Sequence, residues 1–230
     1  MRRGAKSNIF ESVLRGYVSS IMRRRTFKNC ENLAEMEFRS TAERNSRARI
    51  LRTAAAIFAY KGYAGATIKE IVETAKAGQA TLYHHFKDKR SLYVTLLDDT
   101  MSAFCAVLEP RPAEPPGVKE RLRSLFLRVE NFLLSHPNET RMVNSHLYGP
   151  PSGAPRYRLA GHSSRIEDIL GNLLLPAVTE GKIREEELGA FLLLVLSLLR
   201  DMQRSTDSGT QPDSRNMQQY FKALDFILEG

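Results

Sequence analysis

The sequence of 230 residues has no tryptophan, only two cysteines and no long apolar run. Cys30 and Cys105 lie far apart without a CxxC pair, so the sequence predicts neither a disulfide framework nor a cysteine-based zinc site, and fits a reducing cytosol. The longest apolar stretch, residues 191–199, is less than half of the ~20 residues that a membrane-spanning helix needs. We therefore expect a cytoplasmic protein that is not integral to a membrane.

Catalytic and metal-binding patterns are also missing. His136, His146 and His162 do not occur in the HxxxH or HExxH spacing that places two ligands on one helix face. No Gly-rich phosphate loop or nucleophile elbow is found, because the "HSSR" at His162 lacks the flanking glycines. Cys105 fits a buried small apolar residue better than a sensor thiol. We expect a protein that is not an enzyme and has no metal or cofactor.

The net charge of +8 is concentrated in the first hundred residues. Residues 1–43 carry nine lysines and arginines against five acids, residues 44–100 carry ten against five, and residues 101–230 carry fifteen against sixteen. This distribution indicates a polyanion-binding part joined to a neutral remainder. An uneven surface charge without function is the alternative.

Helical periodicity recurs from Asn45 to the end of the chain. A first helix, Asn45 to Lys61, should end at Gly62, and Thr67 with Glu70 predicts a capping box at the start of a second, short helix. Further helices are expected at 79–85, 89–108, 118–135, 139–147, 157–179, 185–203 and 213–228. No stretch alternates with the two-residue period of a strand, so the predicted fold class is all-α.

The second and third helices are separated by a short turn of small residues, which is typical of a helix-turn-helix. Leu82 and Phe86 can anchor the third helix, Gln79 to His85, which leaves its polar side chains on the outside. Gln can bind adenine with two hydrogen bonds, Thr can contact a base edge, and Tyr can donate to a phosphate. Ala80 would allow a close approach to the groove. DNA contact explains this surface better than simple solvation, which would favour Glu and Lys pairs.

The stretch from Ala48 to Tyr93 resembles the DNA-binding domain of the TetR family of bacterial transcriptional regulators. The resemblance rests on Ile50, Ala54 and Phe58, on "KGY" at 61–63, on Thr67-Ile68, and on "TLYHHF-KDK" from Thr81 to Lys89. The family usually has Gly at the position of Lys76 and Ser or Thr at that of Gly78. The resemblance implies a homodimer whose third helices read two half-sites, and a helical C-terminal domain that binds a small inducer and dimerises.

Carried over by position, the resemblance implies seven DNA-binding residues. Thr67 and Lys89 would contact phosphates, Tyr83 a phosphate and a base, and His85 would lie near the backbone. Gln79, Thr81 and His84 would face base edges. Ala80, whose short side chain allows a close approach to the groove, completes the predicted DNA-binding set.

Three parts are expected along the chain. Residues 1–43 are a basic N-terminal extension, expected to be poorly structured, for which a DNA-binding arm, a membrane-surface helix, a targeting peptide and an untranslated upstream stretch are the alternatives. Residues 44–92 form the helix-turn-helix domain, and residues 93–230 form the ligand-binding and dimerisation domain.

Apolar stripes near the C-terminus predict the dimer interface. Its expected residues are Phe191, Val195, Leu198, Met217, Tyr220, Leu224 and Ile227. Packing of the same residues inside one monomer is the alternative.

The expected inducer is a largely apolar small molecule held by one or two hydrogen bonds. Its predicted contacts are Phe104, Leu108, Phe126, Val129, His146, Tyr148, Ile169 and Leu173. An ordinary filled core is the alternative, because it has the same pattern.

The function predicted from the sequence is a ligand-responsive transcriptional regulator, a repressor that a small inducer releases from a palindromic operator in double-stranded DNA. The alternative is a basic helical architectural protein that coats DNA without a specific operator.

Overall fold

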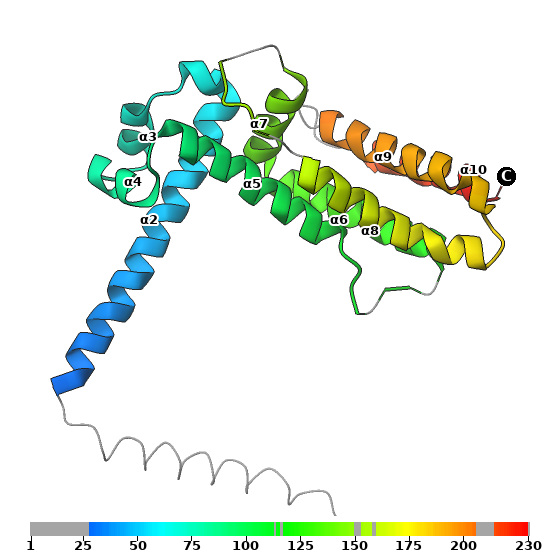
Figure 1. Ribbon diagram of the computed structural model, residues 1–230, viewed down its shortest axis with the longest axis horizontal. Helices are drawn as coiled ribbons and strands as arrows, with labels where there is room; N and C mark the ends of the chain where they lie inside the picture. Colours follow the sequence, from blue (N-terminus) through cyan, green and yellow to red (C-terminus); the bar gives the residue numbers. More distant parts are fainter. Residues whose placement is uncertain are drawn as a thin grey trace, which may run out of the picture. The chain divides into compact units, whose positions relative to one another are not determined.

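The structure is a computed structural model that describes residues 28–112, 114–115, 117–149, 153–157, 160–205 and 214–229. Throughout these ranges the regular structure is helical, which confirms the predicted all-α fold (Figure 1). The chain divides into two units, Met1–Arg47 and Ala48–Gly230, and helices α3 to α10 belong to the second.

Helix α2 (Lys28–Gly65) begins earlier than the Asn45 start that the pattern predicts. Residues 28–44 contain neither glycine nor proline, so nothing in their composition interrupts the helix. The predicted end is confirmed, because Gly62 has a φ of 69° and a ψ of 177°, which breaks the helical path at this residue. The last residues of the predicted extension are therefore part of α2, and residues 1–27 lie outside the described residues.

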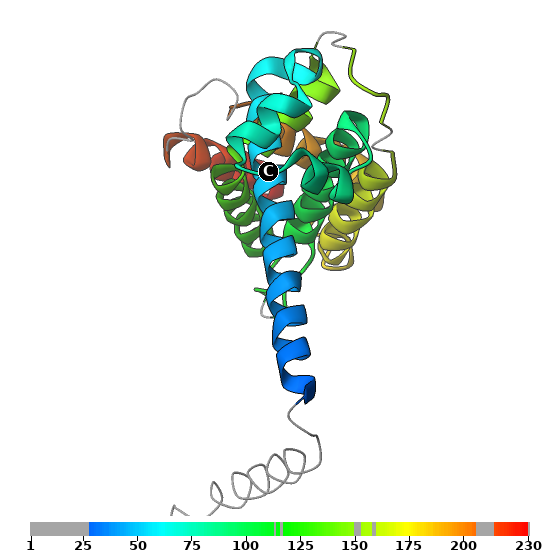
Figure 2. The ribbon, with the colours of Figure 1, turned by 90° about the vertical axis from the view of Figure 1, so that its left-hand side faces the viewer.

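Helices α3 (Ile68–Thr74) and α4 (Gln79–His85) follow as a pair that pack on each other. Longer helices come next, namely α5 (Lys89–Leu108), α6 (Val118–Ser135), α7 (Pro137–Tyr148), α8 (Ala160–Thr179), α9 (Leu188–Ser205) and α10 (Ser214–Glu229). A short 3-10 turn, Glu185–Glu187, precedes α9. Helix α5 packs against α6, α7 and α8, while α9 lies along α8 and α10 along α6. Figures 1 and 2 show α5 running from the α3–α4 pair into this bundle.

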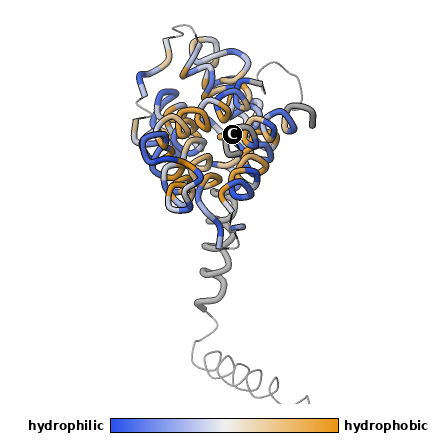
Figure 3. The backbone as a smooth tube through the Cα atoms, turned by 90° about the vertical axis from the view of Figure 1, so that its right-hand side faces the viewer, coloured by the Kyte–Doolittle hydropathy of each residue, from blue (hydrophilic) through white to orange (hydrophobic). Residues whose placement is uncertain are grey.

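Two apolar clusters meet along α5. The first joins α2, α3, α4 and the first half of α5, and it includes Met101 of α5 and Met142 and Val143 of α7. The second fills the bundle between α5, α6, α8, α9 and α10, and it begins with Phe104 of α5. In Figure 3 apolar and polar stretches alternate along the helical tube, as expected for helices with one buried face. Helix α5 is therefore shared by both clusters.

Helix α5 is long and apolar enough to cross a membrane by length and composition, the only such helix among the described residues. Half of its most apolar segment is buried inside the protein, and its side chains belong to both clusters. Its position in the two cores explains its apolar composition without a membrane.

Candidate DNA interface and ligand cavity

The turn between α3 and α4 has a defined geometry. The backbone N–H of Lys76 donates to Glu73 O at 3.2 Å and that of Ala77 to Val72 O at 2.9 Å, which is the hydrogen-bond pattern of a Schellman motif. Lys76 holds its left-handed position, with a φ of 49°. Gly78 then starts α4 as an N-cap without a side-chain hydrogen bond. This short turn fixes the direction of α4 relative to α3.

Helix α4 is fixed to the protein by few side chains. Leu82 is 0% exposed and Phe86, its C-cap, is 4% exposed, and both belong to the first apolar cluster together with Ile71. Tyr83 is 48% exposed. The other predicted contacts of this helix are exposed or half-buried, namely Gln79, Ala80, Thr81, His84 and His85. The structure therefore brings the predicted third-helix residues onto one accessible surface.

Thr67 caps α3, since its Oγ1 accepts a hydrogen bond from the backbone N–H of Glu70 at 3.1 Å. The Glu70 carboxylate is bound by Lys61 Nζ at 2.5 Å, so the predicted reciprocal capping bond is replaced by this ion pair. The hydroxyl hydrogen of Thr67 remains able to donate to an anion beside the exposed helix start.

Lys89 has a structural contact that the sequence pattern does not reveal. Its ammonium donates to Tyr63 O at 2.9 Å and to Ala66 O at 3.0 Å, and lies 4.4 Å from the centroid of the Tyr63 ring. These contacts tie the first turn of α5 to the α2–α3 connection. An ammonium has three donors, so one N–H is left for the predicted phosphate.

Exposed cations flank α4 along the chain. They are Lys69 of α3, Lys76 of the turn, and Lys87 and Arg90 after α4. Arg49 donates from Nη2 to Lys76 O at 3.4 Å and so supports the turn before α4. Since residues 44–100 carry ten basic against five acidic side chains, the surface around α4 is suited to a polyanion.

The eight predicted inducer contacts do not form one site. Leu108, Phe126 and Val129 are fully buried in the second cluster, which agrees with the filled-core alternative. Ile169 and Leu173 line a second cavity beside the α5–α6 connection, together with charged side chains of that connection.

Phe104 and Tyr148 line a different cavity, of about 170 Å³, which lies between α5, α7, α8 and α9. This cavity lies where the two apolar clusters meet. Met101, from the first cluster, and Phe104, from the second, both line it. A bound molecule there would contact both clusters.

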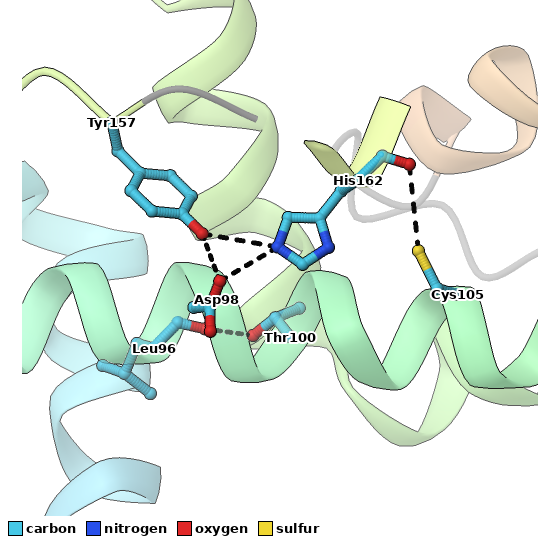
Figure 4. A network of polar contacts seen from close by, with 6 residues as sticks. All are labelled: Leu96, Asp98, Thr100, Cys105, Tyr157 and His162. Carbon is cyan, nitrogen blue, oxygen red and sulfur yellow. Dashed lines mark hydrogen bonds and ion pairs between the residues drawn. The ribbon is translucent and has the colours of Figure 1, made fainter. Parts of the chain in front are cut away.

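A polar network crosses the same region (Figure 4). The Asp98 carboxylate of α5 accepts hydrogen bonds from the Tyr157 hydroxyl and from His162 Nε2, the latter at 3.0 Å. The hydrogen bond from Tyr157, followed by that from His162, lowers the pKa of Asp98, while burial and the Asp98 carboxylate raise the pKa of Tyr157 to about 12. The network links α5 to the start of α8.

His146, one of the predicted ligand contacts, lies in a neighbouring network. Its Nδ1 is 3.5 Å from the Tyr93 hydroxyl and its Nε2 is 3.4 Å from Tyr157 O. No sequence pattern pointed to Asp98 or Tyr157, which are 59 residues apart and meet only after folding.

The predicted dimer residues are mostly core residues. Val195, Met217, Tyr220 and Leu224 are buried within the chain, and the half-buried Phe191 and Leu198 pack against the same cluster. The side chain of Ile227 lies outside the described residues. The exposed face of α9 instead carries Leu193 and Leu194, which are 67% and 45% exposed.

The histidines have structural contacts rather than metal-site geometry. Within the described part of the chain no three His, Cys, Asp or Glu side chains are placed to hold a metal ion. His136 instead stacks on Phe132, with ring centroids 4.5 Å apart.

A short polar helix presented by a second helix, on a basic surface, defines a helix-turn-helix DNA-binding protein with a helical C-terminal bundle. Comparison with known proteins agrees. Residues 50–96 match the family model described as bacterial regulatory proteins, tetR family. The transcriptional repressor AcnR of Corynebacterium diphtheriae is 26% identical over 142 residues, which are 61% of this chain and 69% of AcnR.

Two solved structures share the fold over most of both chains. A tetR-family regulatory protein from Rhodococcus RHA1 has a TM-score of 0.65 and 21% identity, covering 80% of this chain and 96% of its own. PfmR from Thermus thermophilus has a TM-score of 0.61 and 26% identity, covering 79% and 95%. Residues 50–96 thus match the tetR family model, and the fold of the chain is that of solved tetR-family regulators; these likenesses support a DNA-binding transcriptional regulator.

Proposed function

We propose that the protein is a cytoplasmic repressor, and not an enzyme, that binds a palindromic operator as a homodimer and releases it when a small effector binds. One observation carries the DNA-binding part. Helix α4 buries only Leu82, with Phe86 just beyond it, and exposes Gln79, Tyr83 and His84 on a basic surface. A helix that is held by so few residues has its outer surface free for the major groove.

In this proposal Gln79 reads a base and Tyr83 positions the helix. Gln79 is the first residue of α4, and an amide can bind adenine N6 and N7 with two hydrogen bonds. The exposed Tyr83 hydroxyl would donate to a phosphate, as would the Thr67 hydroxyl at the start of α3. Lys89 would add a phosphate contact through its remaining N–H while keeping its two bonds to backbone carbonyls.

The proposed effector site is the cavity between α5, α7, α8 and α9, rather than the scattered set predicted from the sequence. Its position at the junction of the two apolar clusters supports this choice. An effector that fits only a DNA-incompetent arrangement of the two clusters would shift the population towards that arrangement. Such an effector must bind the two arrangements with different affinities. A site confined to one cluster would change less between the two arrangements, so the difference in affinity would be smaller.

Helix α7 would carry the effect to the DNA-binding part. On one side Arg141 lies over the exposed Tyr60 ring of α2, with its guanidinium carbon 5.0 Å from the ring centroid, and Met142 and Val143 pack into the first cluster. On the other side Leu147 and Tyr148 line the cavity, and Asn144 donates to Gln203 O of α9 at 3.0 Å. A shift of α7 would therefore change contacts in the cavity and in the first apolar cluster.

The test measures binding to DNA from upstream of the protein's own gene by fluorescence anisotropy, at fixed salt and with competitor DNA. Gln79→Ala should lower the binding free energy for the operator by ~1–3 kcal/mol and relax the specificity at one base pair. Tyr83→Ala should weaken operator and competitor DNA by similar factors, because a phosphate contact carries no sequence information.

Gln219→Ala, an exposed glutamine on α10, is the matched control and should bind like the parent. Parent-like binding by both α4 variants would contradict the proposed groove contacts. Binding that competitor DNA abolishes would indicate an architectural protein instead.

A further inference from the structure

The cavity between α5, α7, α8 and α9 has an apolar floor of about the size of one ring. The floor consists of Met101, Phe104, Ile166, Leu196 and Leu199. Its volume of about 170 Å³ is close to that of an engineered apolar cavity, ~150 Å³, that binds benzene. Phe104 and Met101 both favour an aromatic occupant, through ring–ring and sulfur–ring contacts.

The rim of the cavity is polar and carries charges of both signs. Arg200 on α9 and Glu167 on α8 line it with Ser163 and Gln203. Arg204 lies over the Tyr148 ring, with its guanidinium carbon 4.8 Å from the centroid, so a second cation borders the opening. Two guanidinium groups against one carboxylate leave a local excess of positive charge.

Arg200 is available for a ligand. It is exposed, and it makes no ion pair or hydrogen bond with another residue in the described part of the chain. A guanidinium binds a carboxylate through two parallel hydrogen bonds, which fixes orientation as well as charge. Apolar lining with a few convergent polar groups is the usual make-up of a small-molecule site.

We propose that the effector is a small aromatic carboxylate, with one ring in the apolar floor and its carboxylate on Arg200. The inference rests on the proposed function, because it names the chemical class of the molecule that releases the DNA. Glu167, on the facing helix, would accept from a hydroxyl or amino substituent of the ring and exclude a second carboxylate.

The second cavity, beside the α5–α6 connection, is a weaker candidate. It is larger, about 340 Å³, but Glu109, Arg111, Glu114 and Arg121 supply half of its lining. None of its lining residues belongs to the first apolar cluster or to α7. A molecule bound there would not touch the helix that reaches the DNA-binding part.

Titration calorimetry on the full-length protein tests the assignment with three probes of one size, benzoate, benzyl alcohol and benzylamine. Benzoate should bind most tightly and benzylamine least. Arg200→Gln should weaken benzoate on the order of tenfold and leave benzyl alcohol unchanged, since only the charged hydrogen bonds are lost. Leu196→Phe should weaken all three, because it fills the floor.

Arg184→Gln, another exposed arginine, is the control and should bind benzoate like the parent. Equal affinity for benzoate and benzylamine, an unchanged benzoate affinity in Arg200→Gln, or no binding of any probe would each overturn the assignment. Anisotropy of the operator complex is recorded on the same preparations, with and without benzoate, which should release the DNA. Specific DNA binding without a benzoate response overturns only this inference, whereas absence of specific DNA binding overturns the proposed function.

Discussion

Lys76 has a backbone conformation that disfavours its own side chain. It occupies the left-handed position of the Schellman motif that ends α3, with a φ of 49°. That position is the reason for the Gly that the family usually has there, because only glycine has no Cβ to clash with the following carbonyl. The Lys76 side chain is exposed, so nothing in the fold depends on it.

Replacing Lys76 by Gly should therefore stabilise the protein. Left-handed backbone costs ~1–2 kcal/mol for a residue with a Cβ. The greater freedom of Gly in the unfolded chain returns ~0.5–1 kcal/mol of that. We expect the free energy of unfolding in urea to rise by up to about 1 kcal/mol. Lys69→Gly is the matched control, since Lys69 lies inside α3 and the same change there should destabilise by ~0.5–1 kcal/mol. A loss of stability in both variants would refute the strain at Lys76.

Residue roles were predictable where they depend on local sequence and not where they depend on folding. The cap at Thr67 and the exposure of Gln79 and Tyr83 follow from helical spacing, and the structure agrees. The carbonyls bound by Lys89 belong to Tyr63 and Ala66, more than twenty residues away, and only the folded α2–α3 connection brings them within reach. Whether its free N–H reaches a phosphate stays a prediction.

At the scale of helices, the residues at which a helix begins and ends were predicted better than the helices against which it packs. The bounds of α4, α5 and α6 agree with prediction because Gly78, Asp88 and Gly117 act through their nearest neighbours. Asp88, for example, accepts from the Ser91 backbone N–H while Ser91 Oγ accepts from the Asp88 N–H. Which helix a stripe packs against depends on the whole chain. The stripes of α9 and α10, predicted for a second copy, pack into their own bundle.

The polar link between α5 and α8 predicts a pH-dependent stability. Hydrogen bonds from Tyr157 and His162 hold the pKa of Asp98 below its ordinary value of 3.8, so the folded state favours the ionised carboxylate. This stabilisation is complete above pH 3.8 and is lost as pH falls through the lower pKa of the folded protein. Asp98→Asn should be less stable than the parent near neutral pH, and the difference should shrink below about pH 4.

Urea titrations of parent and Asp98→Asn between about pH 3 and 7 measure this difference. Asp168→Asn, which removes an exposed acid from α8, controls for the loss of one negative charge. A difference that stays constant down to the lowest pH would show that the Asp98 contacts do not depend on its charge.

At the scale of the molecule, two apolar clusters share α5, and the proposed effector site lies where they meet, beside α7, the helix that reaches the DNA-binding part. The fold class and the presence of a bundle followed from periodicity. The cavity did not, because an apolar stripe looks the same whether it lines a filled core or an unfilled one. Phe126 and Phe104 both lie on an apolar stripe of the sequence. Phe126 is fully buried in the core, whereas Phe104 lines the cavity.

The exposed stripe of α9 is where a second copy would bind. Ala190, Leu193, Leu194 and Ser197 are all exposed and follow helical spacing on one face. Two large leucines in water are an unfavourable surface for a monomer, and small residues on either side allow two helices to approach closely. The proposed homodimer would therefore pair α9 with α9 about a two-fold axis, which matches a palindromic operator.

Light scattering at micromolar concentration should give about 52 kDa for the parent, twice the 26.0 kDa of one chain. Leu193→Glu should shift it to the monomer mass, because a two-fold axis brings both new carboxylates into one apolar interface. The operator affinity of this variant should fall with it, since each chain reads one half-site. Leu134→Glu, which places the same charge at an exposed leucine of α6, should remain a dimer. A monomeric parent would contradict the homodimer, and a dimeric Leu193→Glu protein would move the interface to another face.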